Sequence, residues 1–172
     1  SRGLIVSGKA GVGADTTADS YRKEMDLQME ILGVDYLEFF QVGWFSLEQL
    51  PYLTKKGGAL EALDKARGEG IIGHIILSYH DTPENMFKII DTGYIEGMIV
   101  QYNLLDRRLE EPIAYAGEKG VAIACMGPVG GGRLGMASEK RTSLIPSVSS
   151  TPELALRFVL SNPAVTCALS GM

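Results

Sequence analysis

Short apolar runs bounded by glycine recur along the chain and predict buried β-strands. They cover residues 4–6, 37–42, 74–77, 98–100, 121–125 and 165–169. Runs this short and this rich in β-branched side chains suit buried strands better than helices. We therefore expect six strands, centred near residues 6, 40, 75, 99, 123 and 168.

Segments with helical periodicity separate these runs. In residues 17–32 the apolar side chains fall on one face, and Gly33 follows, where a left-handed residue often ends a helix. Two more helices are expected to begin at the Thr-Pro-Glu sequences of 82–84 and 151–153, because threonine caps a helix and proline fits its first turn. A second apolar stripe covers residues 60–66, and a weaker helical pattern covers residues 113–116.

This alternation of strand and helix predicts a parallel sheet with right-handed crossovers, either an open doubly wound sheet or a closed (β/α)8 barrel. A doubly wound nucleotide-binding fold favours Gly-x-Gly-x-x-Gly after its first strand, but Gly8, Gly11 and Gly13 have the wrong spacing. A P-loop is excluded because Lys9 precedes the later glycines of this stretch instead of following them. We interpret the stretch as a plain glycine-rich turn.

Composition narrows the class of protein. The chain has 172 residues, of which 45% are hydrophobic and 22% charged, which predicts one soluble globular α/β domain over residues 1–172. No apolar run approaches the roughly 18 residues that span a bilayer, and no signal-peptide pattern opens the chain. We therefore expect no membrane partner and a cytoplasmic location.

Charge and cysteine content exclude further classes. The 16 basic residues are scattered and 21 acidic residues outnumber them, so nucleic acid is not an expected partner. Cys125 and Cys167 each lie alone in an apolar run, with no histidine at ligand spacing. We interpret both as buried structural thiols in a reducing compartment and expect no metal site.

Two features carry candidate chemistry. Residues 126–134 (MGPVGGGRL) directly follow a predicted strand, where exposed backbone amides of (β/α) proteins bind phosphate; a merely mobile loop is the alternative. Lys9 lies at the end of the first strand, where its charge would lower the pKa of a neighbouring phenol and make it an easier proton donor. A solvated lysine is the alternative.

Taken together, several phrases resemble the aldo-keto reductase superfamily over nearly the whole chain. The matching phrases are 32–38 (LGVDYLE), 70–75 (GIIGHI), 100–106 (VQYNLLD), 127–131 (GPVGG) and 155–160 (ALRFVL). Residues 77–81 (LSYHD) and 169–172 (LSGM) look closest to the branch whose longer members carry a C-terminal iron–sulfur segment. The sequence has no cysteines spaced to bind such a cluster, so we do not infer an iron–sulfur cofactor from the resemblance.

The resemblance implies a TIM barrel that reduces an aldehyde or ketone with NADP or NAD. Lys9 falls on the family's catalytic lysine. The cofactor-binding positions fall on Ser78 and Gln101 at the nicotinamide carboxamide, Met126 against the ring, Pro128, Val129, Gly130 and Gly131 along the pyrophosphate, and Ser170 and Gly171 at the phosphate-contacting end of the last strand.

The chain departs from the family's pattern at Gly43 and Tyr79, and at Met126, where many members stack a Tyr on the nicotinamide ring. Gly43 stands where the family usually has a catalytic histidine, and Gln41, on the same face of the strand, could orient a carbonyl without replacing an imidazole. Tyr79 occupies the usual position of a carboxamide-binding Asn. We interpret His80 as a polar residue at a helix entry, with a substrate contact as the alternative.

The resemblance also places the family's proton-donating Tyr and its Asp partner on and after the second strand, whereas this chain opens at the third. Six βα units in 172 residues compare with eight units and about 250 residues in a complete barrel. We expect a partial barrel, strands three to eight, completed by a further segment or by an oligomer. The predicted function is NAD(P)-dependent carbonyl reduction of a small molecule. Two alternatives remain: a non-catalytic relative that binds a nicotinamide nucleotide or a partner protein, and a stand-alone six-unit protein of another function.

Overall fold

A computed structural model describes residues 4–136 and 147–169 of the chain. The strands are β1 (Ser7–Gly11), β2 (Leu37–Phe45), β3 (Ile72–Tyr79), β4 (Gly97–Gln101), β5 (Ala122–Met126) and β6 (Val165–Ala168). The helices are α1 (Ala18–Leu32), α2 (Leu50–Thr54), α3 (Ala59–Gly68), α4 (Pro83–Ile90), α5 (Glu110–Glu118) and α7 (Thr151–Leu160), with a 3-10 turn η1 (Leu47–Gln49) before α2.

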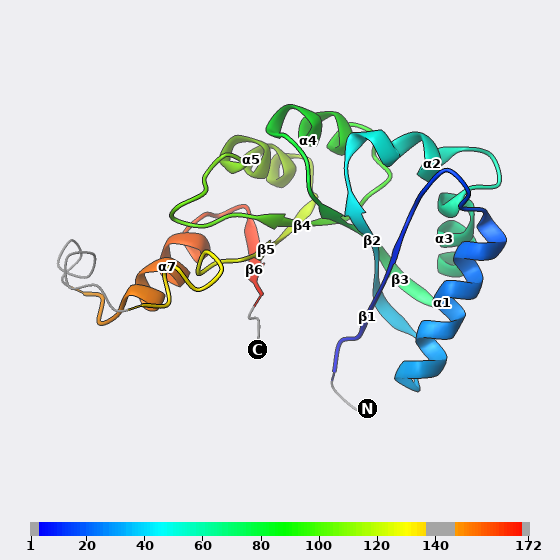
Figure 1. Cartoon of the computed structure of the whole chain (residues 1–172), viewed down its shortest axis with the longest axis horizontal. Helices are drawn as coiled ribbons and strands as arrows, with labels where there is room; N and C mark the ends of the chain where they lie inside the picture. The colour runs from blue at the N-terminus through cyan, green and yellow to red at the C-terminus, as the bar shows by residue number, and fades with distance from the viewer. Residues whose placement is uncertain (1–3, 137–146, 170–172) are drawn as a thin grey trace.

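The described strands form one sheet in the order β1-β2-β3-β4-β5-β6, and every neighbouring pair is parallel. A doubly wound sheet would reverse its strand order and carry helices on both faces. Here the order never reverses, and Figure 1 shows the helices in an arc on the outer side of the strands. The sheet is therefore wound in one direction, as in a barrel.

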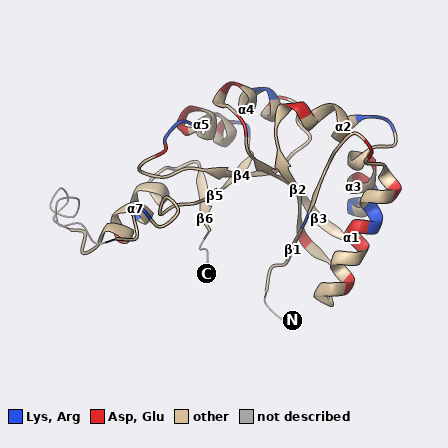
Figure 2. Ribbon diagram, viewed as in Figure 1, with Lys and Arg blue, Asp and Glu red and all other residues tan. Residues whose placement is uncertain are grey.

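The inner face of the sheet is concave. Residues from all six strands, including Ser7 of β1 and Cys167 of β6, line a single hollow of about 230 Å³. The main hydrophobic core lies on the other face, between strands and helices. Figure 2 shows the charged residues mostly on the helices, while the strands carry few.

The first strand differs from the prediction. The apolar run 4–6 precedes β1, and Leu4 and Ile5 are exposed. The glycine-rich stretch interpreted as a turn instead supplies the strand, with Ser7 to Gly11 paired to Phe39 to Gly43. Small residues are needed there, because a Cβ on Gly8 would come within 2.8 Å of the Phe40 ring.

Helix ends follow the predicted signals in part. Thr82 precedes α4 as predicted, but Ser150 caps α7 in place of Thr151, which is already the first residue of that helix. Gly33 ends α1 in the left-handed conformation (φ 64°), as expected, and Thr17 caps its start by accepting a hydrogen bond from the Ser20 backbone N–H. The segment 47–54, where η1 and α2 form, carries no long apolar period and was not predicted. No helix among the described residues is long and apolar enough to cross a membrane.

The two cysteines differ, which corrects the interpretation of both as buried thiols. Cys125 is fully buried, but Cys167 is exposed. The reason is their position in the sheet: Cys125 points into the helix-covered core, whereas Cys167 pairs with Ala124 and lines the concave hollow.

Candidate active site

Within the part of the chain that the structure describes, the predicted site residues lie on β1, near the carboxyl ends of β3 to β5, or in the loop after β5. Along β1 the even-numbered residues Gly8 and Ala10 are buried, while Lys9 between them is exposed. Ser78 lies near the end of β3 and is buried, and Gln101 and Met126 end β4 and β5, where they pair with one another. Parallel strands thus bring these side chains, which are far apart in sequence, to one region.

The position of Lys9 is fixed through its backbone. The side-chain amide of Gln28, on α1, accepts from the Lys9 N–H and donates to the Lys9 carbonyl, both at 2.8 Å. The aliphatic part of the Lys9 side chain crosses Gly43 of β2, since a Cβ on Gly43 would lie 3.0 Å from Lys9 Cγ. Lys9 lines a hollow of about 350 Å³ with residues from the start of α1, among them Thr16, Ser20, Tyr21 and Glu24.

Strand β2 carries a bulge beside Gly43. Val42 pairs with Leu77 and Phe45 with Tyr79, so that Gly43 and Trp44 together stand opposite the single residue Ser78. At this bulge Trp44 adopts a φ of 52°, and it is the one non-glycine residue in the described part of the chain with a positive φ. This conformation is rare for a bulky side chain.

The bulge places the Trp44 indole against His80, which follows β3. The two rings are stacked, with centroids 4.1 Å apart and an interplanar angle of 16°. The His80 backbone N–H donates to the Phe45 carbonyl at 2.8 Å, and its ring Nε2 lies 3.2 Å from Ser78 Oγ. Burial, and after it the positive charge of Lys9, lowers the pKa of His80, so the ring is neutral at pH 7.

A hollow of about 500 Å³ opens at the ends of β3, β4 and β5. Its wall includes His80, Gln101, Met126 and Arg108. The amide of Gln101 lies tightly against Gly127, where a Cβ would come within 2.7 Å of both amide atoms and where φ is +62°. Glycine at 127 therefore allows the side chain of Gln101 to lie against the start of the next loop.

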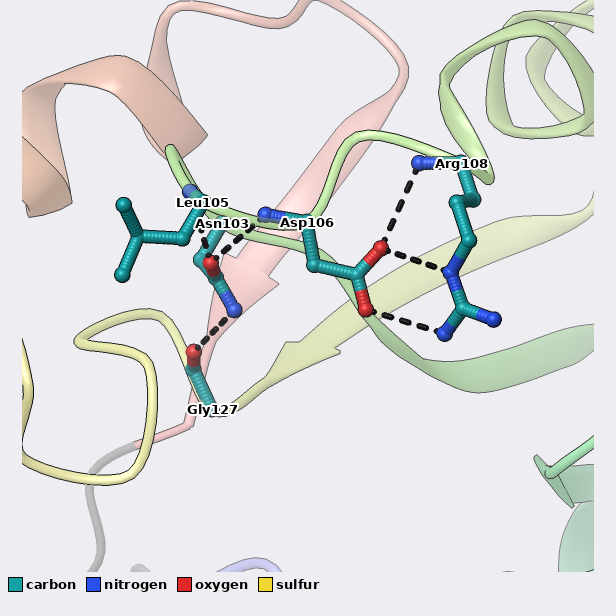
Figure 3. Close-up of polar contacts among 5 residues, drawn as sticks. All are labelled: Asn103, Leu105, Asp106, Arg108 and Gly127. Carbon is teal, nitrogen blue, oxygen red and sulfur yellow. Dashed lines mark hydrogen bonds and ion pairs between the residues drawn. The ribbon is translucent and has the colours of Figure 1, made fainter.

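Buried Asn103 joins the β4 and β5 loops (Figure 3). Its Nδ2 donates to the Gly127 carbonyl at 3.0 Å, while Oδ1 accepts from the backbone N–H groups of Leu105 and Asp106. Asp106 in turn accepts two hydrogen bonds from the Arg108 guanidinium, which holds the pKa of Asp106 below its usual value. One amide thus ties the loop after Gln101 to the glycine-rich loop after Met126.

The glycine-rich loop forms one wall of a larger hollow of about 910 Å³, which it shares with α7 and β6. Gly127, Pro128, Val129 and Gly131 line it, opposite Cys167 among others. Gly130 is buried, and its N–H donates to the Gly127 carbonyl at 2.8 Å. Ser170 and Gly171 lie outside the described residues.

The structure groups most, but not all, of the predicted site residues. Gln101 and Met126 share the smaller hollow, the loop from Pro128 shares the larger one, and Ser78 meets His80. Lys9 lines neither of these two hollows. Tyr79 is buried in the core, and its hydroxyl donates to the Thr82 carbonyl.

Two features of the site were missed by sequence reasoning. The stacking of His80 on Trp44 depends on the bulge in β2, which leaves no sequence signal. The role of Asn103 was missed as well, although an Asn directly after a strand is a recognisable turn signal. Among the described residues, no group of three or more His, Cys, Asp or Glu could hold a metal ion.

The sequence is similar to those of known proteins. The sequence model of the Aldo/keto reductase family matches residues 2–150. The NADH-specific methylglyoxal reductase of Escherichia coli K12 is 24% identical over 117 residues, which cover 67% of this chain and 35% of that protein.

Solved structures match the fold. The holo form of the aldo-keto reductase AKR11C1 from Bacillus halodurans superimposes with a TM-score of 0.79 at 22% identity, covering 98% of this chain and 62% of that one. An aldo-keto reductase from a Medee basin deep-sea metagenome library gives a TM-score of 0.74 at 13% identity, with coverage of 98% and 62%. The chain thus spans less than two thirds of the length of these proteins, and its six parallel strands correspond to most of a (β/α)8 barrel.

Proposed function

The chain belongs to the aldo/keto reductase family, and on this basis we propose that the protein is an NAD(P)-dependent oxidoreductase that reduces the carbonyl group of a small aldehyde or ketone. One observation carries the proposal. Two consecutive residues line the two hollows: Met126 lines the one at the ends of β3 to β5, and Gly127 lines the one beside the glycine-rich loop. Together they offer an amide-lined part for a nicotinamide and a backbone-lined part for its phosphates.

The residues present fit such a cofactor. Ser78 and Gln101 would offer a hydroxyl and an amide to the carboxamide, and the thioether of Met126 would pack against the ring. The backbone from Pro128 to Gly131 would hold the pyrophosphate, with no side chain at the two glycines to keep an anion away. Ser170 and Gly171 complete the phosphate contacts in this proposal.

A bound reduced nicotinamide would supply a hydride to the carbonyl carbon, and the Tyr that the family resemblance implies on the preceding strand of the barrel would donate the proton to the carbonyl oxygen. Lys9 assists that proton uptake, because a positive charge favours the ionised form of a neighbouring proton donor. The Lys9 stem lies across Gly43, on the concave side of the sheet. The relative that reduces methylglyoxal makes this dicarbonyl the first substrate to test.

The experiment uses the natural full-length protein. Titration with NADH and with NADPH measures the two dissociation constants, and an assay with methylglyoxal and a panel of other aldehydes and ketones then measures turnover. We expect binding of at least one cofactor and its oxidation with a carbonyl substrate. Binding without turnover would instead favour a non-catalytic nucleotide-binding protein, and the absence of binding would contradict both functions.

A further inference from the structure

The fold holds His80 at three points. Its backbone N–H is bonded to Phe45, its ring lies flat on the Trp44 indole, and its Nε2 meets Ser78 Oγ. The neighbouring strand β2 supplies two of these three contacts.

The backbone of Trp44 is strained where its indole contacts His80. Trp44 has a φ of 52° within a bulge, and its side chain remains 70% exposed, so burial of the indole does not offset this strain. Bulges and strained residues concentrate beside functional sites, where they direct a side chain. The strained bulge therefore places the Trp44 indole against the His80 imidazole.

The imidazole offers a hydrogen-bond donor at the hollow. His80 lines the hollow of about 500 Å³ together with Gln101 and Met126, the proposed nicotinamide contacts. When Ser78 donates to Nε2, the proton of the neutral ring resides on Nδ1. Ser78 is the one hydrogen-bond partner of this ring in residues 4–136 and 147–169, so the other nitrogen remains available to a ligand.

We propose that His80 is a catalytic residue that donates a hydrogen bond from its ring to the carbonyl oxygen of the substrate, and that Trp44 positions the ring by stacking. The inference rests on the proposed reduction of a carbonyl. A fixed donor of this kind stabilises the negative charge that develops on the oxygen as the hydride arrives. His80 remains neutral throughout and transfers no proton of its own.

The test compares His80→Phe with the parent protein. Phenylalanine keeps a flat ring for Trp44 but cannot donate, so kcat/KM for the carbonyl substrate should fall about 10²-fold. The Kd for NADH, measured without substrate, should not change. His80→Gln retains a donor without the aromatic ring, and its loss of kcat/KM should be smaller than that of His80→Phe.

His74→Phe is the matched control, because the two histidines of the chain lie near opposite ends of β3. Its side chain is exposed and contacts Glu96, so this variant should retain full activity.

If His80→Phe folds and retains the parent kcat/KM, the proposal is overturned. Equal losses in both His80 variants, or a loss explained entirely by weaker NADH binding, would also overturn it. Should His80→Phe not fold, His80→Leu decides, because leucine cannot donate either: a loss of kcat/KM at unchanged NADH affinity supports the donor role, and an unchanged kcat/KM overturns it. A parent protein without turnover would contradict the proposed function itself, before any variant is compared.

Discussion

The stem of Lys9 occupies the space that a side chain at Gly43 would need. A Cβ on Gly43 would lie 3.0 Å from Lys9 Cγ and 3.3 Å from Cδ. Contacts this close are rarely tolerated, so a larger residue at 43 has to displace the lysine. The two positions are therefore coupled: the absence of a side chain on β2 allows the lysine of β1 to cross it.

Gly43→Ala should lower turnover through this coupling. The new methyl group pushes the Lys9 stem aside, whereas the φ of Gly43 lies outside the left-handed region and permits alanine. We expect the free energy of unfolding to change by less than about 1 kcal/mol. Gly11→Ala is the matched control, because Gly11 pairs with Gly43 and its Cβ would meet nothing within 4 Å. Equal activity in both variants and the parent would contradict the coupling.

Lys9→Met should abolish most turnover and leave cofactor affinity nearly intact. Methionine keeps the length of the stem, and the backbone remains bonded to Gln28. Lys9 lines neither of the two hollows proposed for the cofactor. Loss of its charge should therefore slow proton uptake by the substrate and leave cofactor binding unchanged. Without the assistance of Lys9 to proton transfer, kcat should fall by about 10²-fold or more. Steady-state kinetics and NADH titration measure the two effects, and an active Lys9→Met protein would return Lys9 to the role of a solvated surface residue.

The fluorescence of Trp44 should report the protonation of His80. Trp44 is the single tryptophan of the chain and stacks on the imidazole, whose charged form quenches an indole. Burial and the charge of Lys9 lower the pKa of His80, so the fluorescence should fall at a pH below about 6.5, the usual pKa of histidine.

Two variants check the assignment of this transition. Lys9→Met removes a positive charge and should move the midpoint upward, toward the usual pKa, because protonation of His80 becomes less unfavourable. His80→Phe should remove the transition, whereas His74→Phe should keep it. A transition that survives in His80→Phe would show that another group quenches Trp44.

The sequence pattern predicts the sheet well because most strands are apolar and their partners follow in order. Five of the six apolar runs overlap β2 to β6, and the helix signals at Gly33, 82–84 and 151–153 lie at helix ends. The pattern fails at β1, where Gly8 has no room for a side chain because Phe40 and Leu37 fill the space beside it. Packing by a distant residue, which periodicity does not report, decides that strand.

The sequence predicts the candidate site only for residues that occupy recognisable positions of the family's motifs. Gln101 and Met126 lie together at the hollow because parallel strands bring their ends to one edge. The pairing of Trp44 with His80 instead requires an extra residue in β2, and no local propensity signals such a bulge. Exposure of Cys167 likewise follows from the place of β6 at one edge of the described sheet, where Thr166 and Cys167 are both exposed, and an apolar run does not specify that place.

Asn103→Asp should destabilise the protein and weaken NADH binding. The variant keeps an acceptor for Leu105 and Asp106 but cannot donate to the Gly127 carbonyl, and it places a carboxylate in a buried position. An unmade buried hydrogen bond costs about 1–3 kcal/mol, and the glycine-rich loop loses its tether. Urea denaturation measures the first effect and titration the second.

Arg108→Gln is the control for Asn103→Asp, because it removes an exposed ion pair of the same network. Such a pair contributes at most about 1 kcal/mol. If Asn103→Asp were as stable as Arg108→Gln, the tether would not contribute to the fold. If Asn103→Asp bound NADH with the parent affinity, the tether would not position the loop.

Cys167 should react with iodoacetamide in the folded protein, whereas Cys125 should not. Cys125 is fully buried, its thiol donates to the Tyr102 carbonyl at 2.7 Å, and burial raises its pKa to about 11. Almost none of it is thiolate at pH 8, and the thiolate is the reactive form. Cys167 is exposed in the wall of the hollow of about 910 Å³, opposite the glycine-rich loop.

A cofactor that lies along this loop should protect Cys167 from the reagent. Peptide mass spectrometry at increasing NADH concentrations would follow the modified fraction, and the same series in Asn103→Asp should need more NADH for equal protection. Since labelling requires no turnover, the result tests cofactor position independently of catalysis. If Cys167 were modified as fast at saturating NADH as without it, the cofactor would not lie along Pro128 to Gly131. If both cysteines were modified at the same rate, the sheet would open enough to expose Cys125.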